Sequence, residues 1–327
     1  MPPERSRELR GMLFILASVL LWSTAEVVTR TITGMINPFQ VATARFVIAG
    51  ACLAPFLHVE LKRRNLRLNP RILLHALWLS AIGIVASSTL YQYSLDYAGA
   101  GPIATVFGTM PIWVLALSRV ILGTSFSLPK ALGVSTGFLG IAVLSSSESS
   151  ATFSLPGLLL AFGSVICFSL FTVFVKRFAA QYAGLPFTAL TVIIGAILMV
   201  PITAIQGDTL ALDHLPEVAW QVLYLGAGTT GIGYYLYFTG LEAVDPTRAA
   251  SALLLKPPLA VALAWLVLAE PITWRLGIAV GMVLLALYLV NLAPRPALRL
   301  APQPAGAPKL AGAPQLAGTP QLAGTPE

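Results

Sequence analysis

The sequence predicts an all-α membrane protein whose ten transmembrane helices form two inverted five-helix repeats. Three observations carry this prediction. Hydrophobic residues make up 57% of the 327 residues and charged residues only 10%, whereas a soluble domain carries roughly 25% charged residues. The apolar residues fall into ten stretches, most of them near the ~20 residues that a helix needs to span a bilayer. The first half of the chain also matches the second half at an offset of 146 residues.

The ten apolar stretches follow one another with short connections, none of which is long enough to hold a soluble domain. The predicted spans are 11–32, 38–58, 72–94, 101–122, 131–146, 156–177, 184–205, 217–240, 248–269 and 274–292. The first lacks a small-residue cleavage site, so a cleaved signal peptide is not expected. These spans divide the chain into an N-terminal segment 1–10, a first repeat 11–146, a second repeat 156–292 and a tail 293–327.

The tail differs in composition from the rest of the chain. Residues 305–327 repeat a short unit with one proline each time, read as AGAPKL, AGAPQL, AGTPQL and AGTPE. Proline removes a backbone hydrogen-bond donor, and the apolar content is too low to bury a core. We therefore expect the tail to be disordered.

Lysine and arginine indicate how the helices are oriented. The net charge is +7, and the basic residues gather in loops on one side of the predicted bundle, above all in Lys62–Arg71. Loops on the other side carry acidic residues such as Asp96 and Glu270. Because cytoplasmic loops are rich in lysine and arginine, we expect both termini in the cytoplasm, with the protein in a prokaryotic-type plasma membrane. We interpret the basic loop as a contact with lipid headgroups, not with nucleic acid.

The internal repeat is clearest between the first and sixth spans. At the 146-residue offset, the identical pairs there include Gly11 with Gly157, Ser18 with Ser164, Val19 with Val165, Ser23 with Ser169 and Val27 with Val173. At the same offset Trp22 meets Phe168, and Tyr91 meets Tyr237. Each copy holds five spans, an odd number, so the second copy enters the membrane from the opposite side. A pseudo-two-fold axis in the membrane plane then relates the two copies.

Two prolines mark the matching helices that carry the strongest functional signal. Pro111 lies in the fourth span and Pro257 in the ninth, again 146 residues apart. Apolar helices interrupted at corresponding positions of two halves point to the substrate site of a membrane transporter. Irregular backbone at that depth is tolerated where it is buried in protein or lines a water-filled cavity. The sequence therefore predicts a transporter with a site near the bilayer midplane.

Several short motifs resemble one known family. The matching residues are Trp22-Ser23-Thr24 with Arg30, Asn37-Pro38 followed by Arg45-Phe46, the two prolines, and Leu268-Ala269-Glu270. Together with the repeat they make residues 11–292 similar to the drug/metabolite transporter superfamily, EamA type. The resemblance implies a ten-helix fold and transport of small metabolites, often export of amino acids, amines or nucleosides. Two residues depart from the pattern, because Thr124 stands where a glutamate is common and Glu26 where an aromatic or aliphatic residue is usual.

Ionisable residues inside the predicted spans are candidates for the site, because a charge within a bilayer costs several kcal/mol on most scales. Glu26 shares one helix face with Trp22 and Arg30, four residues to either side. It can release a proton when a cationic substrate arrives, or form an ion pair with Arg30 or Arg45 that fixes helix packing. Lys256 can bind a carboxylate or pair with Glu26, or extend to the cytoplasmic interface.

Arg45 is a candidate for either a structural or a substrate-binding role, as the family resemblance implies. Aromatic residues at repeat-related or proline-adjacent positions can line a cavity and suit aromatic or cationic ligands. The complete candidate site comprises Trp22, Glu26, Arg45, Tyr91, Phe107, Pro111, Phe168, Tyr237, Lys256 and Pro257.

These features favour a secondary active transporter that exports small metabolites such as amino acids or amines by alternating access, with protons as the candidate coupling ion. Two alternatives remain: a flippase for lipids or lipid-linked sugars, and an intramembrane sensor or enzyme. The chain has no HExxH, GxSxG or P-loop motif and no cluster of acidic residues, and Cys52 and Cys167 stand alone in apolar runs. We expect no enzymatic activity, cofactor or metal, and partners limited to a small metabolite and membrane lipids.

Overall fold

The computed structural model describes residues 3–32, 35–63, 65, 68–97, 103, 106–124, 127–145, 154–182, 184–205, 215–268 and 274–292. The tail predicted to be disordered lies outside these residues, and so do the side chains of Glu26, Arg30 and Pro257. The described part of the chain is helical, with no strand.

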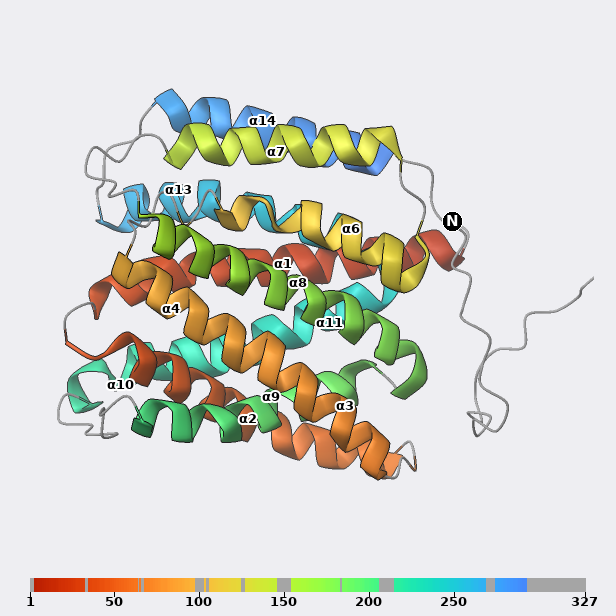
Figure 1. Ribbon diagram of the computed structural model, residues 1–327, viewed down its shortest axis with the longest axis vertical. Helices are drawn as coiled ribbons and strands as arrows, with labels where there is room; N and C mark the ends of the chain where they lie inside the picture. The colour runs from red at the N-terminus through yellow and green to blue at the C-terminus, as the bar shows by residue number, and fades with distance from the viewer. Residues whose placement is uncertain are drawn as a thin grey trace, which may run out of the picture. The chain divides into compact units, whose positions relative to one another are not determined.

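The first half contains five helical segments (Figure 1). They are α1 (Pro3–Thr31); α2 (Pro38–Arg63); α3 (Pro70–Ser80) continued by the π-helical η1 (Ala81–Ala86) and α4 (Ser87–Tyr97); α6 (Met110–Leu122); and α7 (Leu128–Ser145). Residues 3–10, which we assigned to an N-terminal segment, form the first turns of α1.

The second half repeats this order. Its segments are α8 (Leu155–Tyr182); α9 (Gly184–Ile205); α10 (Leu215–Leu223) continued by the π-helical η2 (Tyr224–Ile232) and α11 (Gly233–Ala243); α12 (Pro246–Ala252) continued by the 3-10 turn η3 (Leu253–Leu255) and α13 (Lys256–Leu268); and α14 (Trp274–Leu292). Each of the ten predicted spans contains one of these segments, so the prediction of ten helices is confirmed.

Six described helices are long and apolar enough to cross a bilayer on their own. They are Arg5–Thr29, Pro38–Arg63, Pro70–Tyr97, Leu155–Ala179, Gly184–Ile205 and Pro246–Val267. Three shorter apolar helices accompany them, at Val106–Leu122, Leu128–Val143 and Gly277–Leu292.

The helix ends follow local sequence signals. Asn69 begins α3, because its side-chain oxygen accepts a hydrogen bond from the Ile72 amide at 2.9 Å and Pro70 follows at the first helical position. Asp245 begins α12 in the same way, ahead of Pro246. Gly123 ends α6 with a φ of 66°, a left-handed conformation that glycine adopts without steric cost.

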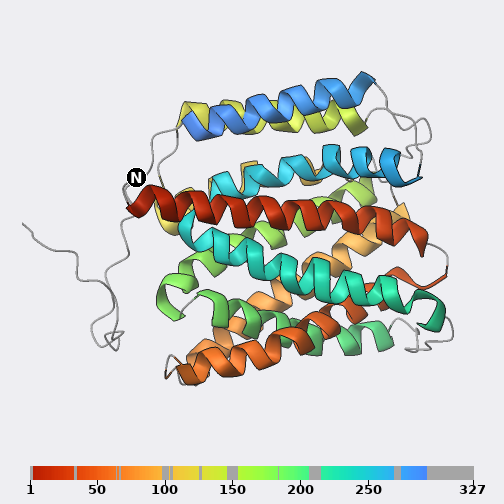
Figure 2. The same ribbon diagram turned by 180° about the vertical axis from the view of Figure 1, so that it is seen from behind.

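The helices of the two halves pack in equivalent pairs. Helix α1 packs on α11, and its repeat counterpart α8 packs on α4, which is the counterpart of α11. Helices α2 and α9 pack on each other, and α7 and α14 form a separate pair (Figures 1 and 2). Replacing each helix by its counterpart in the other half turns the α1–α11 pair into the α8–α4 pair and leaves the α2–α9 and α7–α14 pairs unchanged. A pseudo-two-fold axis requires this pattern.

The equivalence of the halves extends to single hydrogen bonds. The Ser18 hydroxyl donates to the Gly233 carbonyl at 2.8 Å, and the Ser164 hydroxyl donates to the Ser87 carbonyl at 2.7 Å. Adding 146 to positions 18 and 87 gives 164 and 233. The two halves therefore make the same buried contact twice, once in each direction.

Both halves also interrupt the α-helix at the same place. The π-helical segment Ala81–Ala86 corresponds, at the 146-residue offset, to residues 227–232, which lie inside η2. The helical periodicity in the sequence does not predict these segments. Since π-helical turns are rare and are frequently found at functional sites, they direct attention to the side chains that pack on them.

Candidate functional site

The candidate site is built around η2 and the tryptophan of α1 that packs on it. The Trp22 indole N–H donates to the Thr229 carbonyl at 2.7 Å. A Cβ atom at Gly233 would lie 2.5 Å from the indole nitrogen, so only glycine at this position lets the ring approach the helix. The absence of a side chain at Gly233 thus sets the distance between α1 and this segment.

Aromatic rings surround this contact. The Trp22 ring lies edge-on to Tyr234, with centroids 5.7 Å apart, and 5.1 Å from the Tyr237 ring. Phe46 of α2 completes the group at 6.1 Å from Tyr234. Tyr237 is fully buried, and its hydroxyl has no hydrogen-bond partner among the described residues. We call Trp22, Phe46, Tyr234 and Tyr237 the aromatic cluster.

Arg45 reaches the same segment from α2. Its side chain is half-buried, and its Nε donates to the Thr230 hydroxyl at 3.2 Å. That hydroxyl donates in turn to the Leu225 carbonyl at 2.8 Å. The π-helical backbone, through Thr230, therefore holds a cationic side chain in position. We had not singled out Thr229 or Thr230, although the Gly-Ala-Gly-Thr-Thr-Gly run at 226–231 is a signal that marks them.

The two proline-interrupted helices break where the prolines predict. In the second half, η3 ends at Leu255 and α13 begins at Lys256, directly before Pro257. In the first half, α6 begins at Met110, directly before Pro111. The Ser23 hydroxyl lies 3.3 Å from the Lys256 carbonyl oxygen, so α1 contacts this break as well as η2. The Lys256 side chain is half-buried.

Aromatic residues of α4, of the segment before α6 and of α8 form further ring contacts. Tyr91 and Phe107 pack edge to face with centroids 5.1 Å apart. Phe168 packs against two separate clusters of buried hydrophobic residues, one of which contains Phe171 and the other Val165. Its ring lies 6.0 Å from the ring of Phe171. Phe168 is the repeat counterpart of Trp22 but has no N–H to donate, so the two halves are chemically unequal at this point.

Glu26 lies on α1 one turn beyond Trp22, but its side chain is outside the described residues. The alternatives that we gave for it, proton coupling and an ion pair with Arg30 or Arg45, therefore both stay predictions. His75, a further ionisable residue in the predicted span 72–94, contacts α8. Its Nδ1 lies 2.8 Å from the Tyr182 hydroxyl, and its ring stacks on Phe178. Within the described ranges, no group of three His, Cys, Asp or Glu side chains is placed to hold a metal ion.

A family model and several known proteins match most of this chain. The chain matches the model of the EamA-like transporter family twice, over residues 9–146 and 155–292. It is 23% identical over 281 residues to an uncharacterized transporter of Clostridium kluyveri, covering 84% of this chain and 90% of that protein. It is 26% identical over 282 residues to an uncharacterized transporter of Archaeoglobus fulgidus, covering 84% and 95%. A crystal structure covering 88% of this chain and 97% of its own superimposes with a TM-score of 0.72 at 21% sequence identity.

Proposed function

Because the chain belongs to the EamA-like transporter family, and is thus a multi-pass membrane transporter of the drug/metabolite type, we propose that it exports small polar metabolites such as amino acids or amines by alternating access. In this mechanism the two repeats exchange conformations, so that a central site faces first one side of the membrane and then the other. Both termini lie in the cytoplasm, as the distribution of lysine and arginine indicates.

The observation that supports alternating access best is the pair of equivalent hydrogen bonds. Ser18 binds the Gly233 carbonyl, and Ser164 binds the Ser87 carbonyl. Since the same contact is available in both halves, each half can adopt the conformation of the other without losing its contact type. This equivalence is compatible with two conformations of similar energy, which alternating access requires.

The substrate site lies where α1 contacts η2 and the break before Pro257. Trp22 and Tyr237 supply aromatic surface, and the buried Tyr237 hydroxyl supplies a polar group without a described partner. Arg45 and Lys256 supply positive charge that suits a carboxylate. Tyr91, Phe107 and Pro111 of the first repeat and Phe168 of the second complete the site. A zwitterionic amino acid fits this combination of cations, rings and, at Glu26, a carboxylate.

Glu26 is the proposed coupling group. A carboxylate beside the site can exchange a proton for a cationic or zwitterionic substrate, so that the two are moved in opposite directions. The test uses proteoliposomes that contain a pH-sensitive dye and a panel of amino acids, amines and nucleosides. We expect a substrate-dependent proton flux that Glu26→Gln abolishes and that the exposed-carboxylate control, Glu217→Gln, leaves unchanged.

Other outcomes of this experiment select other functions. A proton flux that persists in Glu26→Gln makes Glu26 structural and moves the coupling role to another group. Transport without proton flux indicates uniport. If no solute is moved and labelled lipid crosses the bilayer instead, the proposal is wrong and the protein is a flippase.

A further inference from the structure

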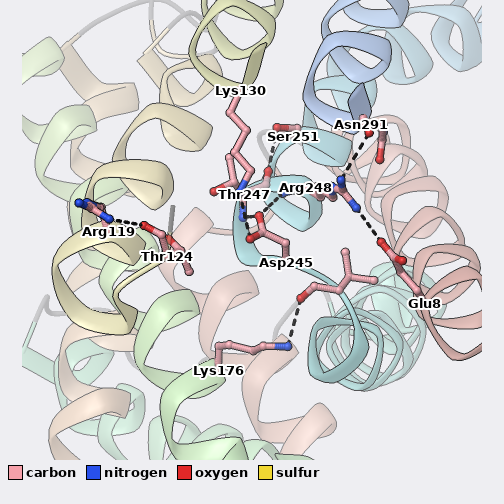
Figure 3. A network of polar contacts seen from close by, with 11 residues as sticks. Glu8, Arg119, Thr124, Lys130, Lys176, Asp245, Thr247, Arg248, Ser251 and Asn291 are labelled. Carbon is pink, nitrogen blue, oxygen red and sulfur yellow. Dashed lines mark hydrogen bonds and ion pairs between the residues drawn. The ribbon is translucent and has the colours of Figure 1, made fainter. Parts of the chain in front are cut away.

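A network of buried polar contacts lies at the end of the bundle where α1 begins (Figure 3). Its centre is an ion pair between Lys130 and Asp245, whose side chains are 0% and 7% exposed and whose charged atoms lie 3.2 Å apart. Lys130 belongs to α7 of the first repeat, and Asp245 precedes α12 of the second. The pair therefore joins the two repeats that alternating access must separate at this end.

A second ion pair joins the repeats in the same region. Arg248 of α12 binds Glu8 of α1 at 2.7 Å, and the two side chains are 4% and 24% exposed. A further nitrogen of Arg248 donates to the Asn291 carbonyl at 3.4 Å, which links the end of α14 to the same arginine. The start of α12 is thus tied to α1, α7 and α14 at once.

Lys176 of α8 completes the network from within the second repeat. Its ammonium group donates to the carbonyls of Leu241, Glu242 and Val244, which end α11, at 2.7 Å for Glu242 and 3.1 Å for Val244. Asp245 also accepts hydrogen bonds from the Thr247 and Arg248 amides, at 3.0 and 3.3 Å. The turn between α11 and α12 is therefore held by two charged groups: the Lys176 ammonium binds the carbonyls at the end of α11, and the Asp245 carboxylate binds the amides at the start of α12.

The sequence does not repeat these ion pairs at the other end of the bundle. At the 146-residue offset, Asp245 corresponds to Gly99, Arg248 to Pro102 and Lys130 to Leu276. Glu8 corresponds to Ser154. None of these counterparts carries a charge, so the same ion pairs cannot form at the matching positions of the opposite end. The opposite end instead contains a cavity of about 120 Å³ between α2 and α4, lined by residues that include Phe39, Gln92 and Asp96.

We propose that Lys130–Asp245 and Glu8–Arg248 form a charged gate, which closes the cytoplasmic end of the transport path and separates when the protein opens to the cytoplasm. The proposal rests on the alternating-access function and on the cytoplasmic position of the N-terminus. A buried ion pair is held closed because removing one partner leaves the other charge buried and unpaired. Opening then requires both charges to be hydrated together, which biases the resting protein toward the conformation that is closed at this end.

The gate makes a specific prediction for single and double variants. Asp245→Asn keeps the side-chain oxygen that begins α12 but leaves Lys130 buried without its counter-ion, so the open conformation, in which Lys130 meets water, becomes favoured. Lys130→Met has the same consequence for Asp245. The double variant Lys130→Met/Asp245→Asn has neither charge, so no unpaired charge is left buried; since that unpaired charge is what makes single removal costly, the double variant returns to the closed conformation.

Hydrogen–deuterium exchange of the full chain in lipid nanodiscs measures this without any substrate. In each single variant we expect exchange of the amides of residues 247–252 to rise at least about tenfold, while amides at the other end, in 92–97 and 39–44, become slower as that end closes. The double variant restores both rates. Arg63→Met is the matched control, since its ion pair with Glu60, at 3.6 Å, lies within one helix; it leaves both ends unchanged.

A change in hydrogen exchange that is confined to one end of the bundle would contradict the gate. If the single variants raise exchange only near α12, without slowing at the far end, the ion pairs stabilise local structure and do not gate. Unchanged exchange in the single variants, or a double variant as open as the single ones, also overturns the proposal. A protein that moves none of the tested solutes can still give the expected pattern, so failure of the proposed substrate class is distinguishable from failure of the gate.

Discussion

The indole nitrogen of Trp22 lies 2.7 Å from the carbonyl oxygen of Thr229, which joins α1 of the first repeat to the π-helical segment of the second. An intact α-helix uses its carbonyls internally, and a π-helical turn alters that pattern. In a bilayer, water is not available to satisfy such a group. The tryptophan therefore both satisfies a backbone carbonyl and positions the ring that borders the candidate site.

Trp22→Phe removes this hydrogen bond. Phenylalanine is also the residue at the matching position of the second repeat, Phe168. An unsatisfied buried acceptor costs about 1–3 kcal/mol, so we expect a lower melting temperature and slower transport. Thermal unfolding in detergent and uptake in proteoliposomes measure the two effects. Trp220→Phe changes an exposed tryptophan and is expected to alter neither; equal melting temperatures for all three proteins would contradict the role of the bond.

Gly233→Ala tests how closely the indole ring must approach. The added Cβ atom falls 2.5 Å from the Trp22 nitrogen, so the ring or the helix must move, at a cost of about 1–3 kcal/mol for overpacking. We expect a shift of tryptophan fluorescence together with reduced stability. The matched control is Gly277→Ala, because a Cβ atom there meets nothing within 4 Å. A Gly233→Ala protein as stable as the control would show that the approach is not needed.

Thr230→Val tests whether the π-helical segment positions Arg45. Valine has nearly the shape of threonine but cannot accept the hydrogen bond from Nε, which leaves the guanidinium without this support. Since hydrogen bonds to charged groups contribute about 1.5–3 kcal/mol, we expect substrate affinity to fall by roughly 10- to 100-fold. Thr230→Ser keeps the hydroxyl and is expected to retain affinity. Direct binding measured by calorimetry, with the fold checked by circular dichroism, distinguishes loss of positioning from unfolding.

Ser18→Ala and Ser164→Ala test the equivalence of the two repeats. Each removes one of the paired hydrogen bonds and leaves a buried carbonyl, of Gly233 or of Ser87, without that donor. We expect both variants to lose a similar stability, about 1 kcal/mol. We also expect them to shift the conformational balance in opposite directions, which distances between spin labels at the two ends of the bundle can report. Shifts in the same direction would mean that the two contacts are not equivalent in function.

The sequence was sufficient for the fold because its signals are long and redundant. Ten apolar stretches and a constant offset each involve many residues, so an error at one boundary does not change the count. Trp22 and Tyr237 were also selected from the sequence, and their rings lie 5.1 Å apart. The repeat alignment identified them as members of matched positions, which is a long-range signal of its own.

The remaining parts of the candidate site depend on single contacts between distant residues. Arg45 and Thr230 are 185 positions apart, and no periodicity relates them. In the sequence, Lys130 and Asp245 each flank a predicted span and look like ordinary loop charges. Their burial and their pairing at 3.2 Å appear only once α7 and α12 are packed. The π-helical segments were missed because small residues tolerate either register and disturb the hydrophobic pattern very little.

The π-helical segments also bear on how the two repeats are related to each other. A π-helical turn accommodates one residue more than the α-helical turn it replaces, and an insertion in only one repeat would change the offset downstream of it. The offset is 146 residues between Trp22 and Phe168, before these segments, and again between Tyr91 and Tyr237, after them. The extra residue is therefore present in both copies. A constant offset of this kind fits an extra residue that was already present in the ancestral five-helix unit.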